Sequence, residues 1–501
     1  MGRNPVINSK SYQTAWAFAG LLVLTFLLFS PALFCGTVFL DDQSYVMENT
    51  HVLTGFSKEN FMWSFREHFG FLSPLLWFSF QLDTVLFGPD AFGFHFTNVL
   101  LHSLNAGLLF LLIRRLTGSF WKALAVAILW GWHPLRVESV AWITERKDVL
   151  CVFFMFLALH AYVSFVRKRS TARMGLVFLL MMAGLMVKSI LVVFPFLLLI
   201  LDFWPLQRFS KHWKPVLAEK IPLFAGAAVY AVVGWFAHTR AITSLEEWSI
   251  ADRLAVALQN FMFYLEKTFC PLGLAAPYPL VKPAWPVAVA SLIGLVALTV
   301  VFWLLRRKAP WGLAGWLWFG IALAPVCGLV QIGSVTTADR FMYLPAIGLT
   351  AAVVWGLSSI RLPAKEIVIV AAVACALLSV RQIAFWRSSD TFFRRTLAVT
   401  ENNGVAHSLY GAWLVMHNRD AEAFPHLSRA VELVPQYLPA NKGLGLLYFK
   451  QGDFDRAMYY IEAAFACSDD QDQASKALEV CRGIIEARKK ALHDKKEGNE
   501  Q

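Results

Sequence analysis

Two adjacent carboxylates, Asp41 and Asp42, follow the first long apolar block of the chain. Neighbouring acids cannot both ionise cheaply unless they share a proton or a cation. The pair therefore suits a catalytic general base, or a site for a divalent metal such as Mg²⁺ or Mn²⁺. The alternative is that Asp41 caps a short helix while Asp42 is solvated. We interpret both residues as candidate catalytic groups, without a choice between them.

A second polar group lies between residues 133 and 148, flanked by apolar blocks. Charges this close to hydrocarbon are costly and normally line a water-filled cavity or a functional site. The spacing of the three acids lets one helical face carry them all. The alternative is a solvated loop. The ionisable residues of this group are His133, Arg136, Glu138, Glu145, Arg146, Lys147 and Asp148.

A third group contains Asp339 and Arg340, just before another apolar block. A guanidinium beside a membrane surface is suited to an anionic oxygen, because its planar fork can hold a phosphate through two hydrogen bonds. Asp339 and Arg340 could instead only cap a helix. Lys188, in a short connection between two apolar blocks, could add a second cation or could reach out to the lipid headgroups.

The elements that must position these groups are membrane helices. The 501-residue chain is 57% hydrophobic and only 16% charged, whereas soluble domains are about half apolar and a quarter charged. Its apolar residues form blocks long enough to cross a bilayer as helices. We predict an all-α, polytopic bundle of about eleven spans, near residues 15–34, 95–113, 119–132, 149–166, 174–188, 189–204, 221–238, 285–305, 311–330, 344–360 and 366–384.

The net charge of +11 follows this topology, because the basic residues cluster at the ends of the apolar blocks. Basic clusters favour the cytoplasmic side, so the charge indicates orientation and no nucleic-acid partner. With the N-terminus inside, segments 35–94, 133–148, 239–284 and 331–343 face outward, as does everything after residue 385. Within the first of these, we expect helices that lie on the outer surface.

The last hundred or so residues repeat themselves with a period of 34 residues. Gly411, Ala423 and Ala430 recur as Gly445, Ala457 and Ala464. This period, with small residues at these offsets, is typical of tetratricopeptide repeats, whose helix pairs pack closely and often bind peptides. We therefore predict a membrane domain over 1–390 and a repeat domain over 391–492. The repeat domain has units near 404–437 and 438–471 and a capping helix at 474–492, and a disordered tail follows at 493–501.

An outward cavity with paired carboxylates, several cations and adjacent hydrocarbon matches the needs of a lipid-phosphate donor. The lipid tail would stay in the bilayer, basic residues would hold the phosphate, and a carboxylate would deprotonate the incoming hydroxyl. The chain contains no P-loop, no G-x-S-x-G and no H-E-x-x-H, so nucleotide, serine-hydrolase and zinc-protease chemistry find no motif here.

The chain resembles the multispan C-type glycosyltransferases with tetratricopeptide repeats, namely the transmembrane O-mannosyltransferases acting on cadherins and their bacterial relatives. The resemblance covers nearly the whole chain. It rests on these segments: Asp41-Asp42, Phe94-His95 with Asn98 to His102, His133-Pro134 to Glu138 and Arg146-Lys147-Asp148, Lys188-Ser189, Leu201 to Leu206, Tyr264 to Lys267 with Tyr278-Pro279, and Ala338-Asp339-Arg340 to Pro345. Only two repeats follow the membrane part, fewer than in the cadherin-directed enzymes, and this favours a bacterial relative.

The resemblance implies inverting transfer of mannose or a similar hexose from a polyprenyl or dolichyl phosphate to a hydroxyl, normally protein Ser or Thr. Asp41 and Asp42 would then be catalytic. The basic residues of the second and third groups would bind the donor phosphate: Arg136, Arg146, Lys188 and Arg340. The expected site-lining residues are His102, His133, Glu138, Glu145, Asp148 and Asp339.

The repeats would present a protein acceptor. The site and the repeats would face the bacterial periplasm, or the lumen of the endoplasmic reticulum in a eukaryote. The rival hypothesis is a non-catalytic, membrane-anchored repeat scaffold for an envelope assembly. A lipid flippase is a third possibility, but it would need more charged residues at the middle of the bilayer.

Overall fold

The computed structural model describes residues 9–238, 248–279, 281–329, 335–360, 362–466 and 471–497. Within these ranges the chain is helical and forms no β-strand, and an isolated bridge pairs His68 with Phe71. The chain divides into two compact units, Met1–Ala276 with Val281–Ser388, and Pro277–Leu280 with Ser389–Gln501. The prediction of an all-α, polytopic protein is confirmed.

Six helical segments of the first unit are long and apolar enough to cross a membrane. They are Tyr12–Phe34, Ala91–Thr117, Ile143–Arg167, Trp213–Trp235, Trp285–Leu305 and Ala364–Ala384. Shorter apolar helices occupy Phe120–Gly131, Thr171–Leu185, Ser189–Phe203, Pro310–Val326 and Ala346–Leu357. Each predicted span overlaps one of these segments. The number that actually cross, and their orientation, stay predictions.

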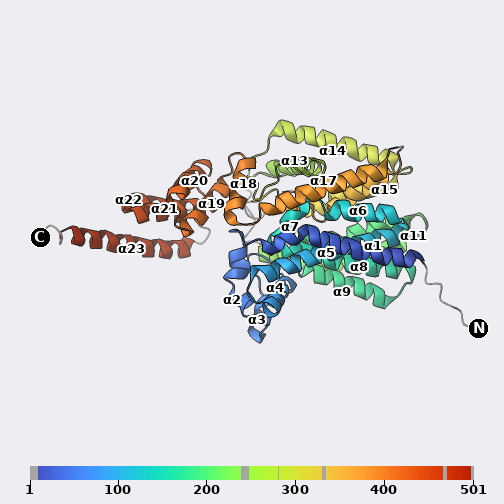
Figure 1. Ribbon diagram of the computed structural model, residues 1–501, viewed down its shortest axis with the longest axis horizontal. Helices are drawn as coiled ribbons and strands as arrows, with labels where there is room; N and C mark the ends of the chain where they lie inside the picture. The colour runs from blue at the N-terminus through green and yellow to red at the C-terminus, as the bar shows by residue number, and fades with distance from the viewer. Residues whose placement is uncertain are drawn as a thin grey trace, which may run out of the picture. The chain divides into compact units, whose positions relative to one another are not determined.

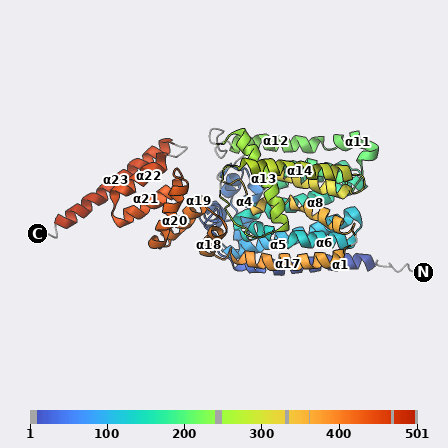
Figure 2. The same ribbon diagram turned by 90° about the horizontal axis from the view of Figure 1, so that it is seen from above.

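The first unit is a bundle in which α1, α5, α6, α8 and α17 lie side by side (Figures 1 and 2). Its helices are α1 (Ser9–Phe29), α2 (Thr50–Leu53), α3 (Lys58–Ser64), α4 (Pro74–Phe87), α5 (Ala91–Thr117), α6 (Phe120–Gly131), α7 (Val137–Ala141), α8 (Arg146–Arg167), α9 (Thr171–Leu185), α10 (Phe194–Phe203), α11 (Phe209–Ala218), α12 (Ile221–His238), α13 (Ile250–Phe269), α14 (Trp285–Leu305), α15 (Pro310–Leu323), α16 (Ala346–Leu357) and α17 (Ala364–Ala384).

Local sequence signals explain where the central helix α5 begins and ends. The side chain of Asp90 accepts a hydrogen bond from the backbone N–H of Phe92 and caps the first turn. Gly118 adopts a left-handed conformation and ends the helix, where its N–H bonds to Arg114 O at 2.8 Å. These two signals fix both ends of α5 and therefore the positions of its polar residues along the helix axis.

The segment between α1 and α5 holds the short helices α2 and α3 and the longer α4. Large apolar side chains of α3 and the residue after it remain exposed, among them Phe61, Met62 and Phe65. This apolar exposure is typical of helices that lie in a membrane interface. Their placement on the outer surface of the membrane stays a prediction.

The second unit contains α18 (Ser389–Val399), α19 (Gly404–Met416), α20 (Asp420–Leu433), α21 (Leu438–Gln451), α22 (Phe454–Ala466) and α23 (Gln471–Glu497). Helix α19 packs on α20, and α21 packs on α22. A Cβ atom on Gly411 would lie 2.5 Å from the Leu427 side chain, and one on Gly445 would lie 2.8 Å from Ile461. The same close approach thus recurs after 34 residues.

The predicted repeats therefore coincide with two helix pairs, and the assignment of these pairs as tetratricopeptide repeats stays a prediction. The predicted capping helix lies within α23. Helix α23 continues to Glu497, into the segment predicted to be disordered, and residues 498–501 lie outside the described ranges. The helical part of this segment ends in Lys495, Lys496 and Glu497, and Lys and Glu are good helix formers, which accounts for the longer element.

Candidate functional site

The two adjacent acids have different environments. Asp42 is buried, its Oδ2 accepts a hydrogen bond from Val38 N at 3.1 Å, and its Oδ1 accepts from Thr144 N at 3.1 Å and Thr144 Oγ1 at 2.6 Å. Asp41 is partly exposed, and no described residue donates a hydrogen bond to its carboxylate or pairs with it. Asp42 therefore connects the loop after α1 to the short turn that precedes α8, while the carboxylate of Asp41 is available to a ligand.

The environment of Asp42 also changes its acidity. Burial raises the pKa of Asp42 to about 6, although hydrogen bonds from Thr144 and Val38 oppose the rise. Both oxygens of Asp42 accept these bonds, and protonation would turn one oxygen into a donor, so the complete set of bonds requires the ionised form of Asp42.

Arg340 connects the third polar group to the second. Its Nη1 lies 2.5 Å from Glu138 Oε1, its backbone N donates to Glu138 Oε2 at 2.9 Å, and its Nε lies 3.0 Å from Glu145 Oε1. Burial raises the pKa of Glu138, and the Arg340 guanidinium opposes this rise. Arg340 thus depends on two buried carboxylates for its position.

Lys147 and Lys188 complete this ion network. Lys147 Nζ lies 3.2 Å from Glu145 Oε1, and Lys188 Nζ lies 3.5 Å from Glu145 Oε2 and 2.5 Å from Asp148 Oδ1. The three cations keep 14–19% of their side-chain surface exposed, whereas the three acids keep only 0–6%. The cations therefore lie closer to solvent than the acids, so an anion that enters meets N–H groups first.

Tyr45 joins the Asp41 loop to this network. Its backbone N donates to Asp41 O at 2.9 Å, and Lys147 Nζ lies 5.5 Å from the centre of its ring. Arg340 lies 5.1 Å from the ring centre of Trp142. The structure thus brings together the three polar groups that are separate in the sequence, with Asp41 and the three cations around one region.

Arg146 is not part of the exposed surface of this region. Its side chain is fully buried, pairs with Asp83 at 2.6 Å, donates from Nε to Asn98 Oδ1 at 2.5 Å and donates from Nη2 to Phe94 O at 2.6 Å. The prediction that Arg146 binds the donor phosphate finds no support in this placement. Arg146 instead ties α8 to α4 and α5.

Arg136 is also fully buried, between the rings of Trp130 and Tyr343, and donates to Met342 O at 2.6 Å. Its Nε and Nη2 have no hydrogen-bond partner among the described residues. With no exposed surface, it presents no N–H group to solvent. It holds the carbonyl of Met342, at the end of the short turn that begins at Asp339.

The predicted lining residues His102 and His133 both form hydrogen bonds with distant parts of the chain. His102 contacts Tyr343 OH and Gly131 O, each at 2.8 Å. His133 Nε2 lies 3.0 Å from Thr268 O, and its Nδ1 accepts from Leu135 N. Burial lowers the pKa of His133 to about 3, so it is neutral at physiological pH. Asp339 is buried as well.

The residues of this region do not form a convincing metal site. Both carboxylate oxygens of Asp42 already accept hydrogen bonds. In the part of the chain that the structure describes, no cluster of three or more His, Cys, Asp or Glu side chains is arranged to hold a metal. Asp41 and Asp42 therefore do not fit a site for Mg²⁺ or Mn²⁺.

Two residues of the region, Lys147 and Tyr45, were not assigned from the sequence. Lys147 follows Arg146 at the start of α8, and successive residues of a helix point about 100° apart. Arg146 consequently points into the bundle, while Lys147 is partly exposed and pairs with the buried Glu145. The charge of Lys147 was a usable signal, but only the rotation of α8 distinguishes it from its neighbour.

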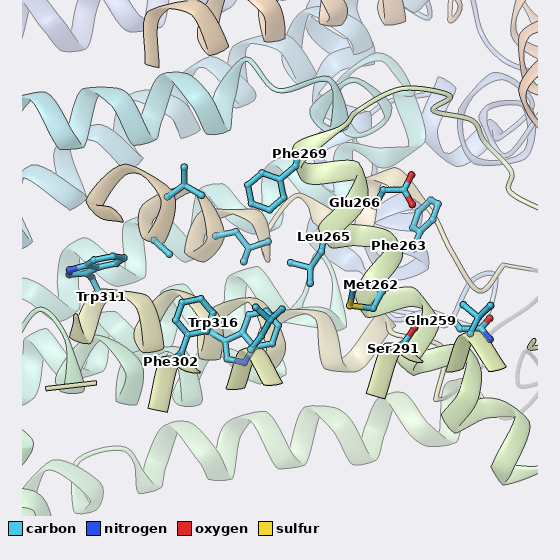
Figure 3. A pocket seen from close by; sticks show the side chains of 15 residues that line it. Gln259, Met262, Phe263, Leu265, Glu266, Phe269, Ser291, Phe302, Trp311 and Trp316 are labelled. Carbon is cyan, nitrogen blue, oxygen red and sulfur yellow. The ribbon is translucent and has the colours of Figure 1, made fainter. Parts of the chain in front are cut away.

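An apolar cavity of about 760 Å³ lies between α13, α14, α15 and α16. Figure 3 shows Met262, Leu265 and Phe269 of α13 opposite Phe302 and Trp316 of α14 and α15. From α13, Tyr264 OH accepts from Ala338 N at 3.0 Å, and Asn260 donates to Thr336 O. Helix α13 thus contacts both the cavity and the segment that carries Arg340.

Comparison with known proteins relates the chain to mannosyltransferases. The family described as dolichyl-phosphate-mannose-protein mannosyltransferase matches residues 73–236. Protein O-mannosyl-transferase TMTC1 of Homo sapiens is 23% identical over 433 residues, 75% of this chain and 49% of that protein. Protein O-mannosyl-transferase TMTC4 of Homo sapiens is 26% identical over 407 residues, 67% of this chain and 54% of that protein.

Protein O-mannosyl-transferase tmtc2 of Xenopus laevis is 38% identical over a shorter match of 89 residues. This match covers 18% of this chain and 11% of that protein. No solved structure matches. The matches confirm the resemblance to transmembrane O-mannosyltransferases, and the chain spans about half the length of the two human relatives.

Proposed function

We propose that this protein is an inverting glycosyltransferase that moves a hexose from a polyprenyl or dolichyl phosphate to a Ser or Thr hydroxyl of a protein. Mannose is the sugar in the names of the relatives described above. The observation that supports the proposal best is the ion network. In this network three partly exposed cations pair with three buried acids: Arg340, Lys147 and Lys188 with Glu138, Glu145 and Asp148.

The three cations would bind the donor phosphate. Each uses some of its N–H groups on the buried acids, and Arg340 Nη2 makes no bond with another described residue. The acids hold the cations in place before the donor arrives, so little reorganisation is needed when charge develops on the departing phosphate. The apolar cavity beside α13 would take part of the lipid tail, because 12 of its 15 lining residues are apolar.

Asp41 would act as the general base. It removes the proton of the acceptor hydroxyl as that oxygen attacks the anomeric carbon of the sugar. The bond between the anomeric carbon and the phosphate oxygen breaks, and its electron pair leaves with the lipid phosphate. The attack from the opposite face inverts the anomeric configuration. Asp42 would not touch the substrate and would instead position Asp41 through its bonds to Thr144 and Val38.

The second unit would hold the acceptor, since paired-helix arrays present concave surfaces to peptides. The site and this unit would share the extracytoplasmic side of a bacterial inner membrane or the lumenal side of the endoplasmic reticulum. The competing hypothesis is a non-catalytic repeat scaffold, which would transfer no hexose and for which Asp41→Asn would have no consequence.

The test is hexose transfer from a panel of polyprenyl-phosphate sugars by purified protein in lipid nanodiscs. Asp41→Asn should lower turnover by about 10²–10⁴-fold and leave donor affinity almost unchanged, because only the proton acceptor is lost. The matched control is Glu48→Gln, which removes an exposed acid of the same loop. Near-normal transfer by a folded Asp41→Asn variant would overturn the assignment of the base, and a product of retained configuration would exclude direct inversion.

A further inference from the structure

A tight turn at Phe69 has an unfavourable residue in its first central position. His68 and Phe71 exchange backbone hydrogen bonds of 3.0 and 2.9 Å, and the two residues between them have positive φ, 54° at Phe69 and 78° at Gly70. Two positive φ angles in a two-residue connection define a type I′ turn, where Asn-Gly is preferred. A bulky side chain at positive φ is an outlier, and such outliers cluster at functional sites.

The surrounding residues hold this turn firmly. Glu67 Oε1 accepts from Gly70 N at 2.9 Å. The His68 ring contacts Trp63 O at 2.8 Å and stacks on the Trp63 ring with centres 3.8 Å apart. The conformation of Phe69 is thus imposed by its neighbours, and the side chain is presented from a rigid support.

The Phe69 ring is half exposed and extends the aromatic surface beside the proposed base. It stacks on the Tyr45 ring, with centres 4.4 Å apart and an interplanar angle of 17°, yet Phe69 remains 50% exposed. The backbone N of Tyr45 donates a hydrogen bond to Asp41 O, and the centre of the Tyr45 ring lies 5.5 Å from Lys147 Nζ. Phe69 therefore stacks on Tyr45, the residue that contacts both Asp41 and Lys147.

We propose that Phe69 binds the hexose ring of the donor and contributes to sugar recognition. This inference rests on the proposed function, in which the sugar must lie between Asp41 and the cations that hold its phosphate. One face of a pyranose carries C–H groups and packs against the face of an aromatic ring, whose quadrupole favours positively polarised hydrogens. Simply covering Tyr45 would not require a phenylalanine in a turn that prefers Asn-Gly.

The test compares the binding of two probes, polyprenyl phosphate and polyprenyl-phosphate mannose, to the full-length protein in nanodiscs. Phe69→Asn supplies the residue that a type I′ turn prefers, so folding should be retained while the ring is lost. We expect its affinity for the mannose-bearing lipid to fall by about two- to tenfold, with no change for the sugar-free lipid. Phe69→Tyr should keep the wild-type preference.

The matched control is Phe65→Asn. Phe65 is a similarly exposed aromatic residue of the same segment, but its ring contacts Phe61 and Phe78 rather than Tyr45. Its sugar preference should equal that of the wild type.

Selective loss of affinity for the mannose-bearing lipid in Phe69→Asn, at an unchanged melting temperature, would support the inference. An unchanged preference, or an equal loss for both lipids with a lower melting temperature, would overturn it. Arg340→Ala tests the proposed donor site separately from the role of Phe69, because that site requires this variant to bind both lipids more weakly. If the wild-type protein bound neither lipid, the proposed function would fail together with this inference.

Discussion

Replacing Arg340 with alanine should destabilise the protein through one identifiable carboxylate, that of Glu138. The Glu138 side chain is 2% exposed, and Arg340 is its only cation partner among the described residues. Glu145 would retain Lys147 and Lys188. Removing one member of a buried pair typically costs about 3–5 kcal/mol, because the other charge is left without compensation.

The loss of stability caused by Arg340→Ala should depend on pH, and its direction can be worked out. Burial raises the pKa of Glu138, and Arg340 opposes this rise, so Arg340→Ala should raise that pKa further. A folded-state pKa above that of the unfolded chain means that stability is present below the unfolded value and is lost as pH rises through the folded value. The destabilisation should therefore be larger at about pH 7 than at about pH 5.

The double variant Arg340→Ala/Glu138→Gln tests the origin of this cost. Glutamine has nearly the shape of glutamate without its charge, so it should recover a large part of the lost stability. We expect a coupling of about 1–3 kcal/mol between the two positions. Donor affinity should stay low in the double variant, because the phosphate ligand is still missing.

The assay is thermal unfolding of the four proteins of this cycle in detergent at both pH values, with donor binding measured in parallel. Arg429→Ala is the control, since it removes an exposed pair with Glu432 and should cost at most about 1 kcal/mol. Additive effects of the two substitutions, or a loss of stability that does not change with pH, would refute the reasoning.

The remaining predictions concern Asp42 and the topology. Transfer should fall as pH drops through about 6, because the raised pKa of Asp42 lets its carboxylate take up a proton there. The protonated side chain would release a hydrogen bond from Thr144 or Val38. The pH–rate profile of Asp42→Asn should therefore lack this inflection. Single cysteines at Ser44, Thr337 and Gln451 should all react with an impermeant thiol reagent in intact cells, since the proposal places their segments on the same outer side, and reaction of only some of them would contradict it.

The local elements could be predicted because local patterns encode them. Each predicted span overlaps an apolar helical segment, since uninterrupted apolar residues can satisfy their backbone in hydrocarbon only as helices. The recurrence of Gly411 at Gly445 marked the two helix pairs, because small residues are needed where helices approach closely. The three polar groups were also visible as costly charges beside hydrocarbon.

The roles of neighbouring residues within those groups were decided by tertiary structure. Asp41 and Asp42 are chemically identical in the sequence, and the bonds of Asp42 to the distant Thr144, together with that to Val38, distinguish it as the buried acid. Arg146 and Lys147 are both basic, yet the rotation of α8 turns the first toward Asp83 and the second toward Glu145. Sequence patterns record the type and spacing of side chains, whereas these roles depend on partners far away in the chain.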